Sequence, residues 1–187
     1  MLHINVDFIQ KVKLFQLSES SFIIAMVNQL KPIICLFGDY IVRRGEMADS
    51  MYFLKKGLIR VLCADDENVT LAYLGEGCYF GEIGVLLTGK RSASVVAHTN
   101  CVLYDIKKEP LLRILDAFGY HRVFLESVGR QRLQTTYLKD LQQDENISAG
   151  ANMTNASVMF ERTNTLSVSA REMQQQQQRF FIEARSK

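Results

Sequence analysis

Hydrophobic residues follow a helical spacing over residues 6–30, near the start of the chain. Polar residues 18–21 interrupt this pattern, so we expect two short helices, the second of them capped by a serine. Pro32 then ends the helical region, because proline disfavours a helical conformation in the residue before it. The apolar residues that carry the spacing are Val6, Ile9, Leu14, Phe22, Met26 and Leu30.

From residue 33 the pattern changes to short β-rich segments that alternate with turn signals. Gly38, Gly45 and Gly57 lie between these segments and are interpreted as turn residues, with no role in ligand binding. Many short strands at this spacing predict a mainly-β fold of the sandwich or jelly-roll type. The expected strands cover residues 33–37, 40–42, 50–55, 58–63, 69–74, 93–97 and 102–106.

Helical spacing returns after the last of these strands. Pro110 suits the first turn of a helix that Gly119 ends, and a second helix is expected over residues 120–142. Gly129 is a weak point inside this second helix, because glycine disfavours helix interiors. The remaining residues are rich in Asn, Ser, Thr and Gln, which predicts a disordered tail with a candidate short helix or coiled-coil segment at 174–184.

The composition is that of a soluble globular protein. The chain has 187 residues, of which 48% are hydrophobic and 22% charged, and its net charge of +2 is too small to indicate a nucleic-acid partner. No apolar run approaches the roughly 18 residues that a membrane span needs, and no secretory signal is expected. Cys35, Cys63, Cys78 and Cys101 are widely spaced, which favours free thiols in a reducing compartment over zinc ligands or disulfides.

The segment with the clearest chemistry lies at residues 80–95. Gly81 allows a backbone to approach a ligand closely, and N–H groups at a short turn or helix start can face an anion. Arg91 supplies a permanently charged, forked partner for a phosphate, and Glu82 can accept hydrogen bonds from sugar hydroxyls. These residue types in one short segment predict a binding site for a sugar phosphate, and not a catalytic site.

The order of elements around this segment resembles a cyclic-nucleotide-binding domain. Residues 79–95 resemble the phosphate-binding cassette of hyperpolarization-activated and cyclic-nucleotide-gated cation channels, with the same length between the glutamate and the arginine. Further agreement lies in residues 37–45, 51–53 and 101–106. The resemblance covers residues 7–141, which is most of the chain.

The resemblance implies four regions along the chain. A β jelly roll, or double-stranded β-helix, occupies residues 33–107 and contains the phosphate-binding cassette at 80–95. Entry helices precede it at residues 1–32, two C-terminal lid helices follow at 108–142, and the tail covers 143–187.

The resemblance also implies roles for the residues of the cassette. Arg91 would pair with the cyclic phosphate, and Ser92 would hydrogen-bond the phosphate or the base. Gly81, Glu82 and Ile83 would line the ribose-phosphate, with Glu82 accepting from the 2′-hydroxyl. The residues alone leave a second interpretation open, in which Glu82 and Arg91 form ion pairs with each other or with neighbours.

For the base, the resemblance implies contacts from the wall of the β-roll and from the last helix. Val61, Ala72 and Leu74 would contact the purine, although each of them is a core residue by default. Arg132 and Thr136 would close over the base from the last helix, although an arginine on an exposed helix face is more often solvated.

Three departures from the channel pattern bear on selectivity. Ser92 stands where these channels commonly have threonine, and the hairpin at residues 65–68 is longer than in similar channels. Thr135 and Thr136 stand where the last helix often has a basic and a β-branched apolar residue. Phosphate capture is still expected, whereas base selectivity and the strength of helix closure stay open.

We therefore expect a regulatory module whose ligand is cAMP or cGMP and whose last helix closes on that ligand. The resemblance implies gating of a cation channel; regulation of a membrane exchanger, or a nucleotide-insensitive scaffold with the same fold, is the alternative. The transmembrane region, absent from this chain, would belong to a parent protein that forms a homotetramer, with this chain at the cytosolic face of the membrane. The isolated chain is expected to be soluble.

The sequence lacks the residues that a metal enzyme, a transcription regulator or a kinase would need. A metal enzyme on a jelly roll needs two histidines and a carboxylate that converge, whereas His3, His98 and His121 are scattered, so no metal site and no enzyme is expected. No nucleophile–base pair is apparent. The glutamine-rich tail is not the helix-turn-helix that a transcription regulator needs, and no kinase catalytic domain is apparent.

Overall fold

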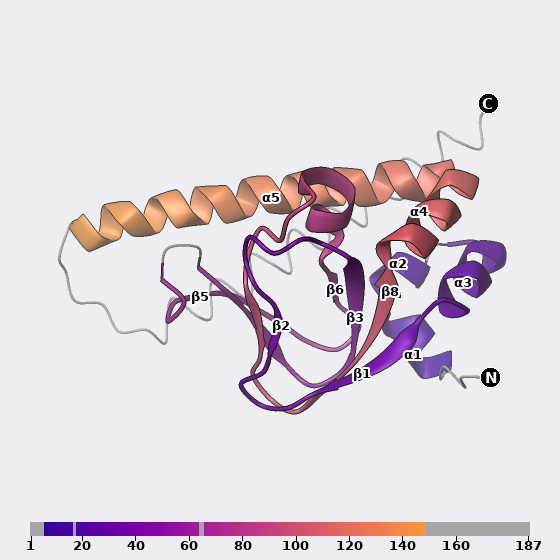
Figure 1. Ribbon diagram of the computed structural model, residues 1–187, viewed down its shortest axis with the longest axis horizontal. Coiled ribbons are helices and arrows are strands. Elements are labelled where there is room, and N and C mark those ends of the chain that lie inside the picture. The colour runs from indigo at the N-terminus through magenta and orange to yellow at the C-terminus, as the bar shows by residue number, and fades with distance from the viewer. Residues whose placement is uncertain (1–5, 17, 64–65, 149–187) are drawn as a thin grey trace. The chain divides into compact units, whose positions relative to one another are not determined.

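The computed structural model describes residues 6–16, 18–63 and 66–148 (Figure 1). The chain divides into a compact unit, Met1–Asp140, and a second unit, Leu141–Lys187. All contacts discussed below lie within the first unit. The expected tail from residue 149 onward, together with its candidate helix, lies outside the described residues.

The β-rich region forms two antiparallel four-stranded sheets, with strand orders β1-β8-β3-β6 and β2-β7-β4-β5. The chain crosses repeatedly from one sheet to the other, which produces the predicted jelly roll (Figure 1). The strands are β1 Lys31–Cys35, β2 Tyr40–Val42, β3 Ser50–Lys56, β4 Ile59–Leu62, β5 Thr70–Leu74, β6 Tyr79–Phe80, β7 Val95–Ala97 and β8 Cys101–Lys107.

The hydrophobic core of the roll draws side chains from both sheets. Leu54 of β3 and Leu103 of β8 come from one sheet, and Ile59 of β4 and Ala97 of β7 come from the other. All four side chains are fully buried, and each buried leucine or isoleucine contributes about 1.5–3 kcal/mol to folding. This packing fixes strands β4 and β7, which adjoin the candidate site.

Two features of the sheets differ from the sequence prediction. Pro32 lies inside β1 instead of ending the helical region. Strand β1 is at the edge of its sheet, where the missing N–H of a proline is tolerated. The sequence pattern does not predict β6, because a strand of two residues, Tyr79–Phe80, cannot show a period-2 alternation.

The entry region contains three short helices instead of the expected two. They are α1 Val6–Lys11, α2 Lys13–Gln16 and α3 Ser20–Val27. The expected serine cap is wrong, because Glu19 holds the N-cap position of α3 and makes no side-chain capping bond. The hydroxyl of Ser18 instead donates a hydrogen bond to the carbonyl oxygen of Leu14, 2.6 Å away.

Two helices follow the β-roll. Helix α4, Lys108–Ala117, begins directly after β8 and has Pro110 in its first turn, as predicted. Helix α5, Gly119–Ser148, extends beyond the expected end at residue 142. No helix within the described ranges is both long enough and apolar enough to cross a membrane.

The first half of α5 packs through one face. Its buried residues His121, Leu125 and Gly129 recur every four residues, so they lie in a row along the helix. The ring of His121 stacks on that of Phe22 in α3, with 3.7 Å between the ring centroids. Burial lowers the pKa of His121, while the nearby Glu19 has a smaller, opposite effect. Helix α5 therefore packs against the entry helices through the ring of His121, which favours its neutral form.

The four cysteines are free thiols, as the sequence predicts. Cys35, Cys63 and Cys101 are buried, and Cys78 is half-buried. Burial is the main cause that raises the pKa of Cys35, which keeps this thiol protonated and weakly nucleophilic.

Candidate functional site

The segment after β6 is a compact turn of helix between two left-handed glycines. Gly81 has a φ of 87°, a π-helix follows at Gly84–Thr88, and Gly89 ends it with a φ of 73°. The N–H of Gly89 donates to the carbonyl oxygen of Gly84 at 2.9 Å, which closes the turn. A Cβ at Gly84 would lie 2.6 Å from the Cβ of Ala48, so only glycine fits there. This geometry presents helix-start N–H groups beside Gly81.

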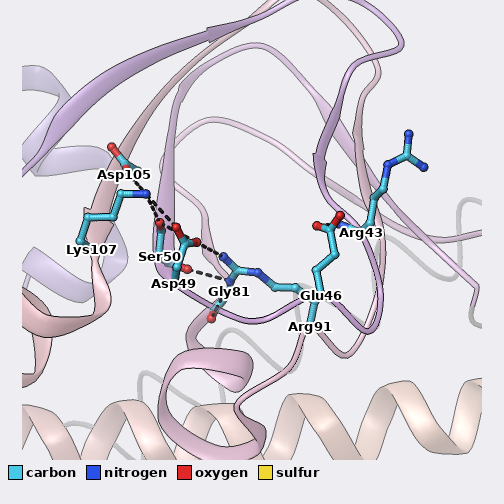
Figure 2. Close-up of polar contacts among 8 residues, drawn as sticks. All are labelled: Arg43, Glu46, Asp49, Ser50, Gly81, Arg91, Asp105 and Lys107. Carbon is cyan, nitrogen blue, oxygen red and sulfur yellow. Dashed lines mark hydrogen bonds and ion pairs between the residues drawn. The ribbon is translucent and has the colours of Figure 1, made fainter.

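Arg91 lies beside this segment, with its guanidinium group held by the start of β3 (Figure 2). Its Nη1 donates to the carbonyl oxygen of Ser50 at 2.7 Å, and its Nη2 lies 3.3 Å from Oδ1 of Asp49. The side chain is 3% exposed. A Cβ at Gly81 would lie 2.8 Å from Nη1, so the glycine allows the guanidinium to pass close to the backbone.

Glu82 is buried above Gly81 and is paired with the last helix. Its Oε1 lies 2.8 Å from Nη1 of Arg132, and the side chains of Glu82 and Arg132 are 2% and 34% exposed. The same Nη1 donates to the carbonyl oxygen of Tyr79 at 3.0 Å, and the guanidinium lies 4.6 Å from the centroid of the Tyr79 ring. Glu82 and Arg91 therefore have different ionic partners, instead of pairing with each other.

The electrostatics around this pair reflect burial and opposite charge. Burial raises the pKa of the Tyr79 hydroxyl to about 12, against a lowering by Arg132. For Arg132, burial is the largest single effect and lowers the pKa, but the attractions of Glu82, Tyr79 and Cys78 and the hydrogen bond to Glu82 together raise the pKa above its ordinary value. The Arg132 guanidinium therefore stays charged around neutral pH.

Gly129 explains how α5 comes so close to the cassette. A Cβ at this position would lie 3.2 Å from Cδ1 of Leu87 and 3.7 Å from Cγ of Glu82. The helix therefore packs with its backbone against the π-helix segment, one turn before Arg132. From the sequence alone Gly129 is only a weak point in a helix; its packing role depends on a tertiary contact.

The three residues expected to contact a base share one face of the β-roll. Val61 of β4 stands opposite Ala72 of β5, and Leu74 stands opposite Ile59 in the same ladder. Residues that pair directly, or lie two apart along a strand, point to the same side of a sheet. Val61 and Leu74 are partly buried and pack against the core, and Ala72 is half-buried. They form an apolar wall, as expected for core residues.

For the other three residues expected at the ligand site, the structure gives the position in the chain and, for two of them, the burial. Ile83 follows Glu82 in the first helical turn and is half-buried. Ser92 is half-buried in a bend between Arg91 and β7. Thr136 lies in the part of α5 whose side chains are outside the described residues.

Sequence reasoning missed the partners of these residues. Asp49 and Ser50, which hold Arg91, carry no motif, and their contacts with Arg91 connect positions about forty residues apart. Glu67, in the long hairpin between β4 and β5, accepts from the hydroxyl of Tyr40 at 2.8 Å and from that of Ser94 at 3.2 Å. These hydrogen bonds connect the hairpin to β2 and to the residue just before β7. In the described residues no cluster of three His, Cys, Asp or Glu side chains is suited to hold a metal ion.

Comparisons with known proteins find relatives of the β-roll. Residues 37–118 match the family model of the cyclic nucleotide-binding domain. The chain is 31% identical over 170 residues to the cone photoreceptor subunit alpha of a cyclic nucleotide-gated channel from Gallus gallus, covering 88% of this chain and 23% of that protein. It is 32% identical over 156 residues to the potassium/sodium hyperpolarization-activated cyclic nucleotide-gated channel 2 of Homo sapiens, covering 80% of this chain and 17% of the channel.

A solved structure shows the same fold. The regulatory domain of Toxoplasma gondii PKA, solved with cAMP, superposes with a TM-score of 0.60 at 21% identity. The match covers 67% of this chain and 48% of that chain. The chain spans less than a quarter of either channel relative, so the similarity concerns one domain of those proteins.

Proposed function

Residues 37–118 belong to the cyclic nucleotide-binding domain family, and from this premise we propose that the chain is a regulatory module that binds cAMP or cGMP. One observation carries the proposal. Two buried side chains of opposite charge, Arg91 and Glu82, flank the left-handed Gly81 at the start of a helical turn. Burying charge is costly, and this arrangement offers a cation to a phosphate and a carboxylate to a sugar.

The phosphate is bound by the guanidinium group of Arg91 together with the Ser92 hydroxyl. Among the described residues, the protein contacts of Arg91 use its two terminal nitrogens, so its Nε–H can donate to a phosphate oxygen. Ser50 and Asp49 keep the guanidinium plane fixed, which reduces the side-chain entropy lost on binding. The N–H groups near Gly81 and Ile83 supply further donors to the anion.

The ribose is recognised by Glu82. Arg132 holds Oε1 of this carboxylate at 2.8 Å, so Oε2 is oriented to accept from the 2′-hydroxyl. The purine lies against the wall formed by Val61, Ala72 and Leu74. A wall without hydrogen-bonding side chains favours a purine by apolar contact and distinguishes adenine from guanine weakly.

Closure of α5 transmits binding. The helix contacts the cassette through Gly129 and Arg132 and contacts the entry helices through His121, with Thr136 expected over the base. A ligand that binds more tightly when α5 is seated shifts the chain toward that state. Because one helix contacts both the cassette and the entry region, the shift reaches the elements at the start of the chain.

We propose that the effector is a cation channel to which this module is attached at the cytosolic face of a membrane. The similarity to two channel subunits supports this assignment, and regulation of a membrane exchanger is the alternative. The parent assembly is a homotetramer in this proposal. In this proposal the module binds ligand without transforming it; among the described residues we find no nucleophile–base pair at the site.

A nucleotide-insensitive scaffold is the second candidate, and one observation favours it. Both buried charged residues of the cassette already have protein partners, because Glu82 pairs with Arg132 and Arg91 with Asp49. These pairs satisfy the two buried charges without a ligand. The two candidates differ in one respect, which is whether saturable binding of a cyclic nucleotide occurs.

Titration calorimetry with cAMP and with cGMP tests the proposal. Wild-type chain is expected to bind at least one of them in the micromolar range, and Arg91→Gln to weaken binding on the order of 10- to 100-fold through loss of charge-assisted hydrogen bonds. Arg113→Gln, at an exposed position of α4, is the matched control and retains wild-type affinity. Ser92→Ala is a second variant that preserves the buried arginine.

Two outcomes contradict the proposal. Undiminished binding by Arg91→Gln removes the site assignment. A folded wild-type chain that binds neither nucleotide, with unchanged hydrogen exchange in α5, supports the scaffold instead.

A further inference from the structure

Asp49 lies between two cations that come from different elements (Figure 2). Its Oδ1 lies 3.3 Å from Nη2 of Arg91, and its Oδ2 lies 2.9 Å from Nζ of Lys107. Ser50 joins the cluster, because its hydroxyl donates to Oδ1 of Asp49 at 3.0 Å and accepts from Nζ of Lys107 at 3.0 Å. Asp105 lies 3.6 Å from the same ammonium group. One carboxylate is therefore shared between the cassette arginine and a lysine outside the cassette.

The backbone places Lys107 at this position. It is the last residue of β8 and stands opposite Ser50 in the β3–β8 ladder. The next residue, Lys108, donates its backbone N–H to the carbonyl oxygen of Asp49 at 2.8 Å, at the first turn of α4. Although the Lys107 side chain is 52% exposed, its backbone is thus fixed from both sides.

The charges of the cluster nearly cancel. Arg91 and Lys107 are positive, and Asp49 and Asp105 are negative. The hydrogen bond from Lys107 is the main cause that lowers the pKa of Asp49, and the attraction of Arg91 is a smaller one. Lys107 is also the nearer partner of this carboxylate, at 2.9 Å against 3.3 Å for Arg91. Without it, Asp49 would have Arg91 as its remaining cation, and the net charge beside a bound phosphate would become negative.

We propose that Lys107 is a positioning residue for phosphate binding, which holds Asp49 so that the charge of Arg91 is available to the ligand. This inference rests on the proposed function. Both physical effects have the same sign: loss of Lys107 strengthens the competition of Asp49 for Arg91, and it lowers the local positive potential. The phosphate site therefore extends from the cassette to the junction of β8 with α4.

The test compares Lys107→Met with Lys108→Met, which removes the same charge one residue further on. Calorimetric titration with the nucleotide that wild-type chain binds is expected to show a two- to fivefold weaker affinity for Lys107→Met, roughly the range of partly exposed ion pairs. Lys108→Met stays near wild type, and Lys107→Arg restores the affinity. The difference between the two methionine variants shrinks with increasing salt, because exposed charges are screened.

A double-mutant cycle with Asp49→Asn separates positioning from a general loss of charge or stability. In the Asp49→Asn background, Lys107→Met is expected to change affinity by less than it does in wild type, because the carboxylate through which it acts is gone. Equal affinities of Lys107→Met and Lys108→Met, or an undiminished effect in the Asp49→Asn chain, overturn the inference. A wild-type chain that binds no cyclic nucleotide overturns the proposed function instead.

Discussion

Removal of Arg132 is expected to destabilise the fold, because it leaves the Glu82 carboxylate buried without its cation. Arg132→Met keeps most of the side-chain length and removes every donor. Loss of the partner of a buried charged group costs about 1–3 kcal/mol, and about 3–5 kcal/mol for a fully buried pair. Since the Arg132 side chain is 34% exposed, water reaches the site and the lower range applies. In a domain of this size the melting temperature falls by about 2–10 °C.

Urea unfolding followed by circular dichroism measures this cost. Arg130→Met is the matched control, because Arg130 lies on the same helix with a side chain 67% exposed and pairs with Glu126 at i,i+4. Its expected effect is within about 0.5 kcal/mol. In a Glu82→Gln background, the cost of Arg132→Met is expected to fall, since no buried charge remains. Equal effects of the two methionine variants, or strict additivity of Glu82→Gln and Arg132→Met, would refute the reasoning.

Two further predictions concern stability. Gly84→Ala is expected to cost at least about 1–3 kcal/mol, because the new Cβ would lie 2.6 Å from Ala48 Cβ and 3.0 Å from the Lys90 carbonyl oxygen. Gly75→Ala, with no heavy atom within 4 Å of its Cβ, is the control, and similar urea midpoints for the two would contradict this account. Because burial lowers the folded-state pKa of His121, the unfolded chain binds more protons below pH 6.5. The contribution of neutral His121 to folding stability is therefore fully present above the unfolded-state pKa of about 6.5 and is lost as the pH falls. His121→Gln should reduce the change in urea midpoint between pH 7 and 5. An unchanged dependence of the midpoint on pH would exclude His121 as the cause.

The sequence predicts the fold and the family because both signals are local. Short strands with turn signals predict the jelly roll, and a glycine, a glutamate and an arginine at fixed separations carry the resemblance to the family. Strand β6 is not predicted because a strand of two residues cannot show an alternating hydrophobic pattern. The serine cap is wrong because α3 begins at Ser20, which makes Glu19 the N-cap residue, while the Ser18 hydroxyl bonds Leu14.

The ionic partners are not predictable from local pattern. Arg91 meets Asp49 across 42 residues, and Lys107 meets Asp49 across 58. The pair of Lys107 with Asp49 is set by the β3–β8 ladder, which brings Ser50 opposite Lys107, and a ladder register is a property of the folded sheet. A surface lysine at the end of a strand gives no signal of this kind. The position of Lys107 beside Asp49 follows only from the register of the β3–β8 ladder.

Gly129 is a point of low helix propensity within the continuous helix α5. A glycine in a helix interior is about 1 kcal/mol less favourable than alanine, which is roughly a fivefold smaller helical population at that point. The turn that carries Arg132 lies just beyond it and is held by the bond to Glu82. The residue that permits close contact with Leu87 is therefore also the point where we expect local opening of α5 to begin. The same missing side chain allows the contact and lowers the helical propensity beside it.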